Sequence, residues 1–275
     1  CRRQRQMCIR DRFLGMLSHL LCIETTTTQC SVALCEGGEL SSLAQSNHEN
    51  YQHAQLLHMY IDKVLSKHNL KTSDLGAIAL SSGPGSYTGL RIGAAAAKGL
   101  CYGNDIPLIA IPTLDIVARE ITPSDGHIIA TLDARRDEVY CAIYTHEYQS
   151  VQPPSPHVIT SNSFAEWTAK GPVYFVGTGL EKCEKTIHQN TQFIFPKDST
   201  YPSAAHMVKQ AQDAFEKQEH LLKKDKPVVV ITENGLDAGS AGVELLKLGI
   251  EEVYLLKDGL ISCLLYTSPS PRDKS

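Results

Sequence analysis

The chain has 275 residues, 42% of them hydrophobic and 20% charged, which is ordinary composition for a globular protein of one large or two modest domains. Its formal net charge of -4 excludes a strongly basic surface that could bind nucleic acid unaided, so a role with RNA would require a partner. No run of about 18 apolar residues is present, and we therefore expect no membrane-spanning segment.

The cysteines and the two ends of the chain bear on where the protein works. None of the nine cysteines forms a C-x-x-C pair, and several lie in apolar segments, which favours reduced thiols in the cytoplasm. A signal peptide is not expected, because the apolar patch near the start contains His19 and has no small-residue cleavage site. We interpret residues 1–19 as a non-native leader and residues 263–275 as a non-native tail.

Two segments of the chain share one pattern, in which an acidic residue ends a strand and a tight connection leads into a second strand. The two acids are Glu24 and Asp133. The four predicted strands are residues 21–24, 30–34, 128–133 and 139–144.

Each copy of this pattern continues, after a helical segment, into an apolar strand that ends in a G-x-G sequence, at residues 83–85 and 177–179. The repetition predicts an α/β fold made of two half-domains of like topology, residues 20–115 and 116–218. Chance is the alternative, since strands that end in an acid are common.

Two facing half-domains would bring Glu24 and Asp133 toward one cleft at the strand ends, where open α/β sheets bind ligands. Carboxylate oxygens suit a magnesium ion, so an ATP-dependent small-molecule kinase or ATPase is one candidate function. Residues 25–28 are threonines, however, where a hairpin that contacts nucleotide phosphate usually needs glycine. Catalysis by this cleft alone is therefore not expected.

The glycine-rich segment 82–93, SGPGSYTGLRIG, joins an apolar strand at 75–80 to a helix expected over residues 90–99. Gly89, Gly93 and Ala97 are four residues apart, so they share a helix face that another backbone can approach closely. A phosphate site at the helix N-terminus is the alternative, but no Lys-Ser or Lys-Thr follows the glycines as in a P-loop. We therefore predict a packing face.

His48, His53 and His58 are each five residues apart. That spacing rotates successive side chains by about 140° on a helix, whereas two metal ligands on one helix face are four residues apart. We predict an amphipathic helix over residues 53–68 and no metal site. Its apolar residues are Leu56, Leu57, Tyr60, Ile61 and Leu65.

Taken together, these motifs resemble those of the TsaB (YeaZ) family. The resemblance rests on residues 23–27 (IETTT), the helix that begins at His53, the glycine segment 82–93 and residues 133–140 (DARRDEVY). It covers about residues 20–217 and implies an α/β fold of duplicated actin/Hsp70/sugar-kinase-like (ASKHA, ribonuclease H-like) half-domains, with an incomplete C-terminal half.

Family members are non-catalytic partners of TsaD in the transfer of threonylcarbamoyl to the tRNA adenosine beside the anticodon, with the ATPase TsaE as a third component. The resemblance implies that this chain is no enzyme by itself, holds no cofactor of its own and works in a cytoplasmic complex that uses ATP through its partners. A heterodimer with TsaD, or a homodimer, is expected.

The resemblance also assigns candidate interface residues, which lie on two helices: His53, Leu57, Gly89, Gly93 and Ala97. TsaD carries an H-x-x-x-H metal pair on the first of these helices, and His53 and Leu57 stand at the matching positions here. This departure agrees with a scaffold that binds no metal.

Residues 219–262 leave the family pattern and resemble the active-site half of a rhodanese domain. Thr232 stands where the sulfur-accepting cysteine is expected, and Asp237 replaces a basic residue, so sulfur transfer is not expected. We interpret this segment as a foreign, degenerate fragment. A genuine last α/β unit of the second half-domain is the alternative.

Overall fold

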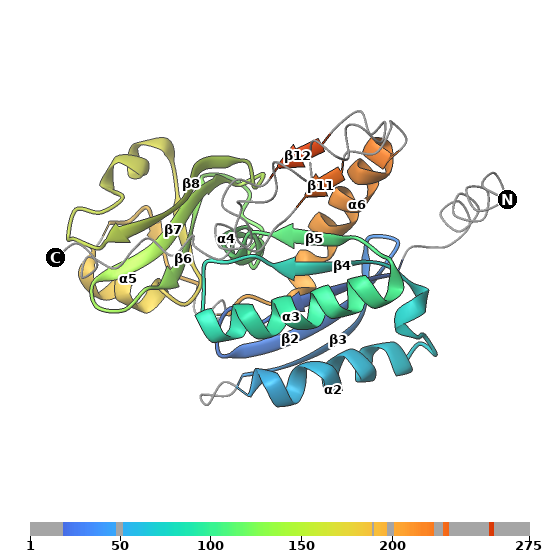
Figure 1. Ribbon diagram of the computed structural model, residues 1–275. Coiled ribbons are helices and arrows are strands. Elements are labelled where there is room, and N and C mark those ends of the chain that lie inside the picture. Colours follow the sequence, from blue (N-terminus) through green and yellow to red (C-terminus); the bar gives the residue numbers. More distant parts are fainter. Residues whose placement is uncertain are drawn as a thin grey trace, which may run out of the picture. The chain divides into compact units, whose positions relative to one another are not determined.

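The computed structural model describes residues 19–47, 52–188, 190–196, 201–222, 228–230 and 253–255. The chain divides into two compact units, residues 1–213 and residues 214–275. The first unit contains two five-stranded sheets with their covering helices (Figure 1).

The first sheet has the strand order β3-β2-β1-β4-β5. Its central strand β1 pairs antiparallel with β2 and parallel with β4, and β4 pairs parallel with β5. The strands are β1 (His19–Glu24), β2 (Gln29–Glu36), β3 (Glu39–Asn47), β4 (Leu75–Ser81) and β5 (Leu108–Ile111). The first strand thus begins at His19, the last residue of the predicted leader.

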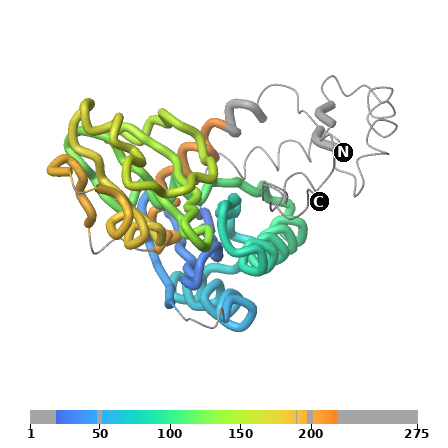
Figure 2. Tube along the Cα trace, turned by 90° about the vertical axis from the view of Figure 1, so that its left-hand side faces the viewer, coloured from blue at the N-terminus to red at the C-terminus, as the bar shows by residue number. Residues whose placement is uncertain are grey.

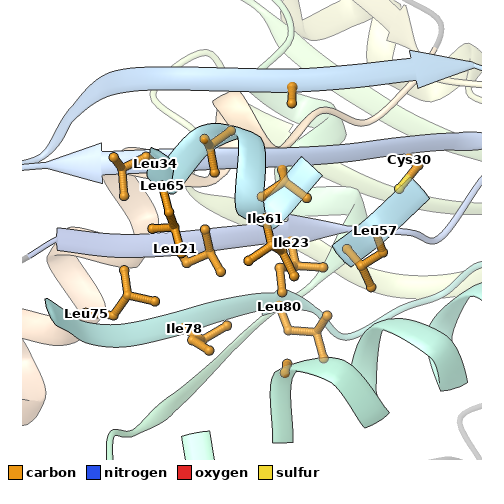
Figure 3. Packing of buried hydrophobic residues seen from close by; sticks show 14 of the residues in the cluster. Leu21, Ile23, Cys30, Leu34, Leu57, Ile61, Leu65, Leu75, Ile78 and Leu80 are labelled. Carbon is orange, nitrogen blue, oxygen red and sulfur yellow. The ribbon is translucent and has the colours of Figure 1, made fainter. Parts of the chain in front are cut away.

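One face of this sheet is covered by α2 (His53–Ser66) and α3 (Tyr87–Asn104), which contact each other (Figures 1 and 2). The predicted amphipathic helix is confirmed, because Leu57, Ile61 and Leu65 recur at helical spacing and are all buried. Their side chains pack against alternate residues of β1 and β4, such as Ile23 and Ile78 (Figure 3). A 3-10 turn, η1 (Thr72–Asp74), leads into β4.

The second sheet has the order β10-β9-β6-β7-β8, which corresponds strand for strand to β5-β4-β1-β2-β3 in the first sheet. Its strands are β6 (His127–Asp133), β7 (Glu138–Thr145), β8 (Ser150–Val158), β9 (Val173–Val176) and β10 (Phe193–Ile194). Parallel and antiparallel pairings match strand for strand, so β6 corresponds to β1 and β9 to β4. The predicted duplication is confirmed.

The segments that cover the second sheet are shorter than those of the first. A 3-10 helix, η2 (Ala165–Lys170), takes the place of α2, and α5 (Leu180–Thr186) takes the place of α3. Strand β8 carries three prolines and forms the edge of the sheet, where proline is tolerated because outward-pointing N–H groups have no neighbouring strand to bind.

The two halves are tied together by short helices that follow each sheet. Helix α4 (Thr113–Ala118) contacts β6 and β7, and η3 (Ala204–Met207) contacts β1 and β2. The buried Tyr144 of β7 donates a hydrogen bond to Asp115 of α4. The predicted boundary between residues 115 and 116 therefore falls inside α4. This duplication of a five-stranded sheet with its helices is the predicted actin/Hsp70-like fold.

Helix α6 (Val208–Leu222) continues from the first unit into the second, which also contains the parallel strands β11 (Val228–Val230) and β12 (Val253–Leu255). The predicted rhodanese-like positions Thr232 and Asp237 lie outside the described residues, as do most of segment 219–262, the tail 263–275 and residues 1–18 of the leader. No helix in the described part of the chain combines the length and apolar character that a bilayer crossing requires.

Candidate functional site

The loop between β1 and β2 is closed by other parts of the same half-domain. Thr25 and Thr26 are buried, with 0% and 1% of their surfaces exposed. The Thr25 hydroxyl donates to the Gly89 carbonyl oxygen (2.9 Å), and the Ser86 N–H donates to the Thr26 carbonyl oxygen (2.6 Å). His53 donates from Nε2 to the Thr27 carbonyl oxygen (2.7 Å). Three hydrogen bonds, from α2, α3 and the turn before α3, thus hold this loop in place.

The glycines of segment 82–93 are explained by this contact. A Cβ added at Gly85 would overlap Thr26, and one added at Gly89 would overlap the Thr25 carbonyl oxygen. At Gly93 it would overlap the Thr25 side chain. The small-residue face is therefore a packing face, as predicted, and what packs on it is the loop of the same chain.

All five candidate interface residues are buried inside the half-domain: His53, Leu57, Gly89, Gly93 and Ala97. They do not form an exposed face, so the residues that could touch another protein are different ones on the same helices. The reason is that the spacing of four identifies a shared helix face but not the element that covers it. Contact with a partner stays a prediction.

The outer face of α2 and α3 carries large exposed side chains. Met59 is 62% exposed, Tyr87 58% and Tyr102 93%. The Arg91 guanidinium lies 5.3 Å from the centre of the Tyr87 ring, one turn earlier on α3. We call these four residues the outer face. Exposed aromatic and arginine side chains of this kind are typical of protein contact surfaces.

Glu24, at the end of β1, is fully buried. One of its oxygens, Oε1, accepts hydrogen bonds from the N–H and the hydroxyl of Thr26, both at 2.5 Å. Burial raises the pKa of Glu24 to about 7, although hydrogen bonds from Thr26 and Ser81 oppose the rise. A buried carboxyl bound to its own loop is poorly placed to hold a magnesium ion.

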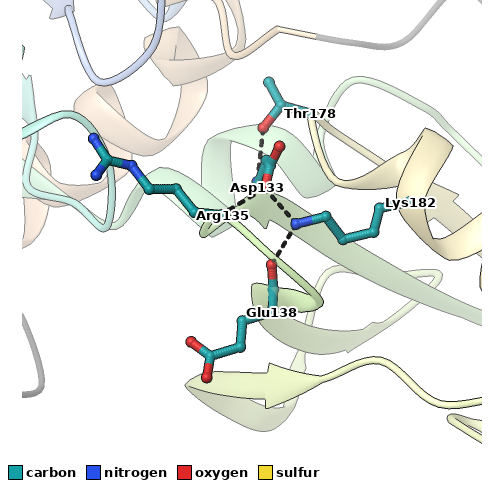
Figure 4. A network of polar contacts seen from close by, with 5 residues as sticks. All are labelled: Asp133, Arg135, Glu138, Thr178 and Lys182. Carbon is teal, nitrogen blue, oxygen red and sulfur yellow. Dashed lines mark hydrogen bonds and ion pairs between the residues drawn. The ribbon is translucent and has the colours of Figure 1, made fainter. Parts of the chain in front are cut away.

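Asp133, at the corresponding end of β6, lies in an open site instead (Figure 4). Its side chain is 53% exposed, and its Oδ1 contacts Lys182 Nζ (2.5 Å) and the Arg135 N–H (2.9 Å). Lys182 Nζ also donates to the Glu138 carbonyl oxygen (2.8 Å), and the Asp133 N–H donates to the Thr178 hydroxyl (3.0 Å).

Beside this network is an open pocket of about 500 Å³. It is lined by residues from the end of β6, the β9–α5 turn, α5 and the segment before η3, namely Asp133, Gly177, Thr178, Leu180, Glu181, Lys182, Lys185, Thr186 and Tyr201. Glu24 does not line it. The prediction that both acids face one cleft is thus corrected: they are equivalent in topology, but Asp133 lines this pocket and Glu24 is fully buried.

His53 and His58 lie on different faces of α2, as their spacing of five residues predicts. His53 is buried, and burial lowers its pKa, although the bond to Thr27 opposes this; His58 is exposed. His48 lies outside the described residues. Within the part of the chain that the structure describes, no group of three or more His, Cys, Asp or Glu is arranged to share a metal ion.

Sequence reasoning missed the backbone of the β6–β7 connection. Arg135 and Arg136 have φ angles of 72° and 48°, in the left-handed region that favours glycine. No local signal predicts this, because arginine carries no preference for that conformation.

Comparisons with known proteins agree with this architecture. The family model TsaD, described as tRNA N6-adenosine threonylcarbamoyltransferase, matches residues 45–234. A protein of Haemophilus influenzae named tRNA threonylcarbamoyladenosine biosynthesis protein TsaB is 31% identical over 70% of this chain and 84% of its own length. The protein of the same name from Escherichia coli is 27% identical over 68% of this chain and 86% of its own length.

Among solved structures, YeaZ from Pseudomonas aeruginosa superposes with a TM-score of 0.62 at 28% identity. The match covers 74% of this chain and 94% of that one. Together with the duplicated sheets and the glycine-packed loop, these matches show that the chain belongs to the TsaB (YeaZ) family, within the wider group that the TsaD model describes.

Proposed function

We propose that the chain is a non-catalytic scaffold subunit that activates TsaD in the transfer of threonylcarbamoyl to the tRNA adenosine beside the anticodon. The names of its relatives place those proteins in threonylcarbamoyladenosine biosynthesis. In this proposal the chain works in the cytoplasm, holds no cofactor of its own, and belongs to a complex that uses ATP through its partners.

The closed β1–β2 loop is the observation that carries the scaffold role. A loop that holds nucleotide phosphate presents backbone N–H groups to the ligand, and it needs room for the phosphate. Here the loop is covered by Gly85, Gly89 and Gly93, whose backbones lie against Thr25 and Thr26. Glu24 is enclosed behind the same loop. The first half-domain therefore supports function by contact rather than by phosphate chemistry.

The outer face supplies a surface for that contact. Met59, Tyr87 and Tyr102 are large and exposed, and burying such side chains is the main source of affinity in protein interfaces. Because α2 and α3 are fixed to the sheet by the buried residues on their inner sides, this face is preorganised for TsaD or for a second copy of the chain.

Reconstitution tests the proposal directly. The purified chain is mixed with TsaD, TsaE, tRNA and threonylcarbamoyl-adenylate, and threonylcarbamoyladenosine is measured. We expect the yield to rise well above that of TsaD and TsaE alone. Equal yields with and without the chain would contradict the scaffold role.

The pocket beside Asp133 favours a second candidate, an ATP-dependent small-molecule kinase or ATPase. Its polar lining includes Asp133, Thr178 and Lys182, and its volume of about 500 Å³ is within the range of small-molecule sites. Calorimetric titration with Mg-ATP separates the two candidates. Sub-micromolar binding with turnover by the isolated chain, abolished in Asp133→Asn, would favour the enzyme.

A further inference from the structure

The two five-stranded sheets end in four edge strands, and three of these carry features that prevent pairing with a further strand. Strand β8 contains three prolines, β5 lies between Pro107 and Pro112, and β10 has only two residues and is soon followed by Pro196. Strand β3, the outermost strand of the first sheet in Figure 1, has nine residues and contains no proline, lysine or arginine. It is therefore an unprotected edge.

The contrast with β8 is informative because β3 and β8 are equivalent strands of the two half-domains. Each pairs antiparallel with the second strand of its half, β3 with β2 and β8 with β7. Proline cannot donate the backbone hydrogen bond that an added strand would accept. The duplicated fold thus presents the same edge twice, and the sequence closes it with proline in one half only.

The outer side of β3 can accept a further strand. Apart from the ladder with β2, no backbone hydrogen bond of residues 39–47 occurs among the described residues. Alternate residues of such a strand direct their N–H and C=O groups away from the neighbour that they already have. The strand also exposes two large apolar side chains, Leu40 and Leu43. Its register with β2 shifts near Ser41, and residues 42–47 pair regularly.

The sequence of β3 suits a second copy of the same strand. A two-fold axis at the midpoint of the strand would set Leu43 against its counterpart in the other copy, and Glu39 against Asn47. Glu39 is the only charged residue of β3. The two Glu39 side chains would be about 27 Å apart, well beyond the screening length of about 10 Å. The strand can therefore pair with itself without opposing like charges.

We propose that the chain forms a homodimer in which two β3 strands pair antiparallel and join the first sheets of two copies into one continuous sheet. Such a contact uses the same surface on both copies, so it closes at the dimer. It goes beyond the proposed function, and it uses none of the four residues of the outer face.

Charge exchange at Leu43 tests this arrangement, with sedimentation of the full chain measured over a wide range of concentration. Leu43→Lys and Leu43→Glu each place two like charges directly opposite each other, so each should raise the dissociation constant of the dimer at least tenfold. An equimolar mixture of the two variants should restore the dimer, because lysine then faces glutamate.

Val151→Lys is the matched control. Val151 is 44% exposed on the equivalent edge strand β8, and Leu43 is 37% exposed, so the same charge is added at a similar position. This variant should keep the dissociation constant of wild type.

Hydrogen exchange of the wild-type chain gives a measurement that needs no substitution. Amides of residues 39–47 should exchange more slowly at high protein concentration than at low concentration, because the dimer pairs the outward N–H groups. Amides of β8 should exchange at the same rate at both concentrations.

Four outcomes would overturn the homodimer: a monomer at every concentration, a dimer that Leu43→Lys leaves intact, a mixture of the two charge variants that stays monomeric, or protection of the β3 amides that appears only when TsaD is added. A dimer that Tyr102→Asp dissociates and Leu43→Lys does not would assign the contact to the outer face instead. All of these leave the proposed function intact, whereas a chain that dimerises through β3 but gives no stimulation of TsaD would overturn the proposed function alone.

Discussion

Gly89 and Thr25 are in direct contact. The Thr25 hydroxyl donates a 2.9 Å hydrogen bond to the Gly89 carbonyl oxygen, and there is no room between Gly89 and the Thr25 backbone for a Cβ. This contact joins α3 to the β1–β2 loop. The glycine segment and the threonine loop are therefore packed directly against each other.

Gly89→Ala should therefore destabilise the protein by about 1–3 kcal/mol, because backbone must move to admit the methyl group. Gly99→Ala is the matched control on the same helix. A Cβ there meets nothing within 4 Å, and alanine should stabilise the helix by up to about 1 kcal/mol. Urea unfolding followed by circular dichroism measures both. Equal stabilities of the two variants would show that the contact is not tight.

Glu24→Gln should flatten the dependence of stability on pH. The folded pKa is about 7 against an ordinary 4.5, so the fold favours the neutral carboxyl. That contribution is fully present below about pH 4.5 and is lost as the pH rises through 7. The free energy of unfolding of wild type should fall relative to that of Glu24→Gln by about 3 kcal/mol over this range.

Unfolding of both proteins in urea at pH 4.5, 6 and 7.5 gives the comparison. Glu184→Gln, which changes an exposed glutamate, should keep the wild-type profile. If the difference between wild type and Glu24→Gln were constant with pH, the pKa of Glu24 would be the same in the folded and the unfolded protein, and burial would not raise it.

Tyr102→Asp should weaken the complex with TsaD without affecting the fold. The side chain is 93% exposed, so its replacement costs little folding free energy, whereas a charge introduced into the proposed contact surface should reduce affinity at least tenfold. Val151→Asp, at a 44% exposed position of the edge strand β8, is the control. Equal affinity of both variants for TsaD would remove Tyr102 from the interface.

Tyr144→Phe should lower the free energy of unfolding by about 1–3 kcal/mol, because Asp115 loses the hydroxyl donor that ties α4 to β7. Burial already raises the pKa of Asp115, and the Tyr144 hydroxyl opposes that rise, so the pKa should increase further in the variant. Tyr140→Phe on the same strand should change stability less, since no hydrogen bond of its hydroxyl occurs among the described residues. Thermal and urea unfolding would show the difference.

The elements that sequence predicted well are those with a strong local pattern. The paired strands around Glu24 and Asp133 repeat the same alternation of apolar residues, and the structure confirms all four. The helix expected over residues 90–99 extends from Tyr87 to Asn104, because Ser86 caps its start and the left-handed Asp105 ends it. Propensity alone predicted the alanine-rich centre of this helix but not its capped ends.

By itself, the sequence determined the two half-domains, their strand-ending acids and the close backbone approach at the glycine segment, because periodicity and residue size act locally along the chain. Only the tertiary structure decided what approaches those glycines and how the two acids differ. Both depend on contacts between distant segments: the Thr25 hydroxyl binds the Gly89 carbonyl oxygen in the first half, whereas Lys182 of α5 binds the exposed Asp133 in the second. The same local pattern thus gives a sealed loop in one half and an accessible, arginine-bearing hairpin in the other.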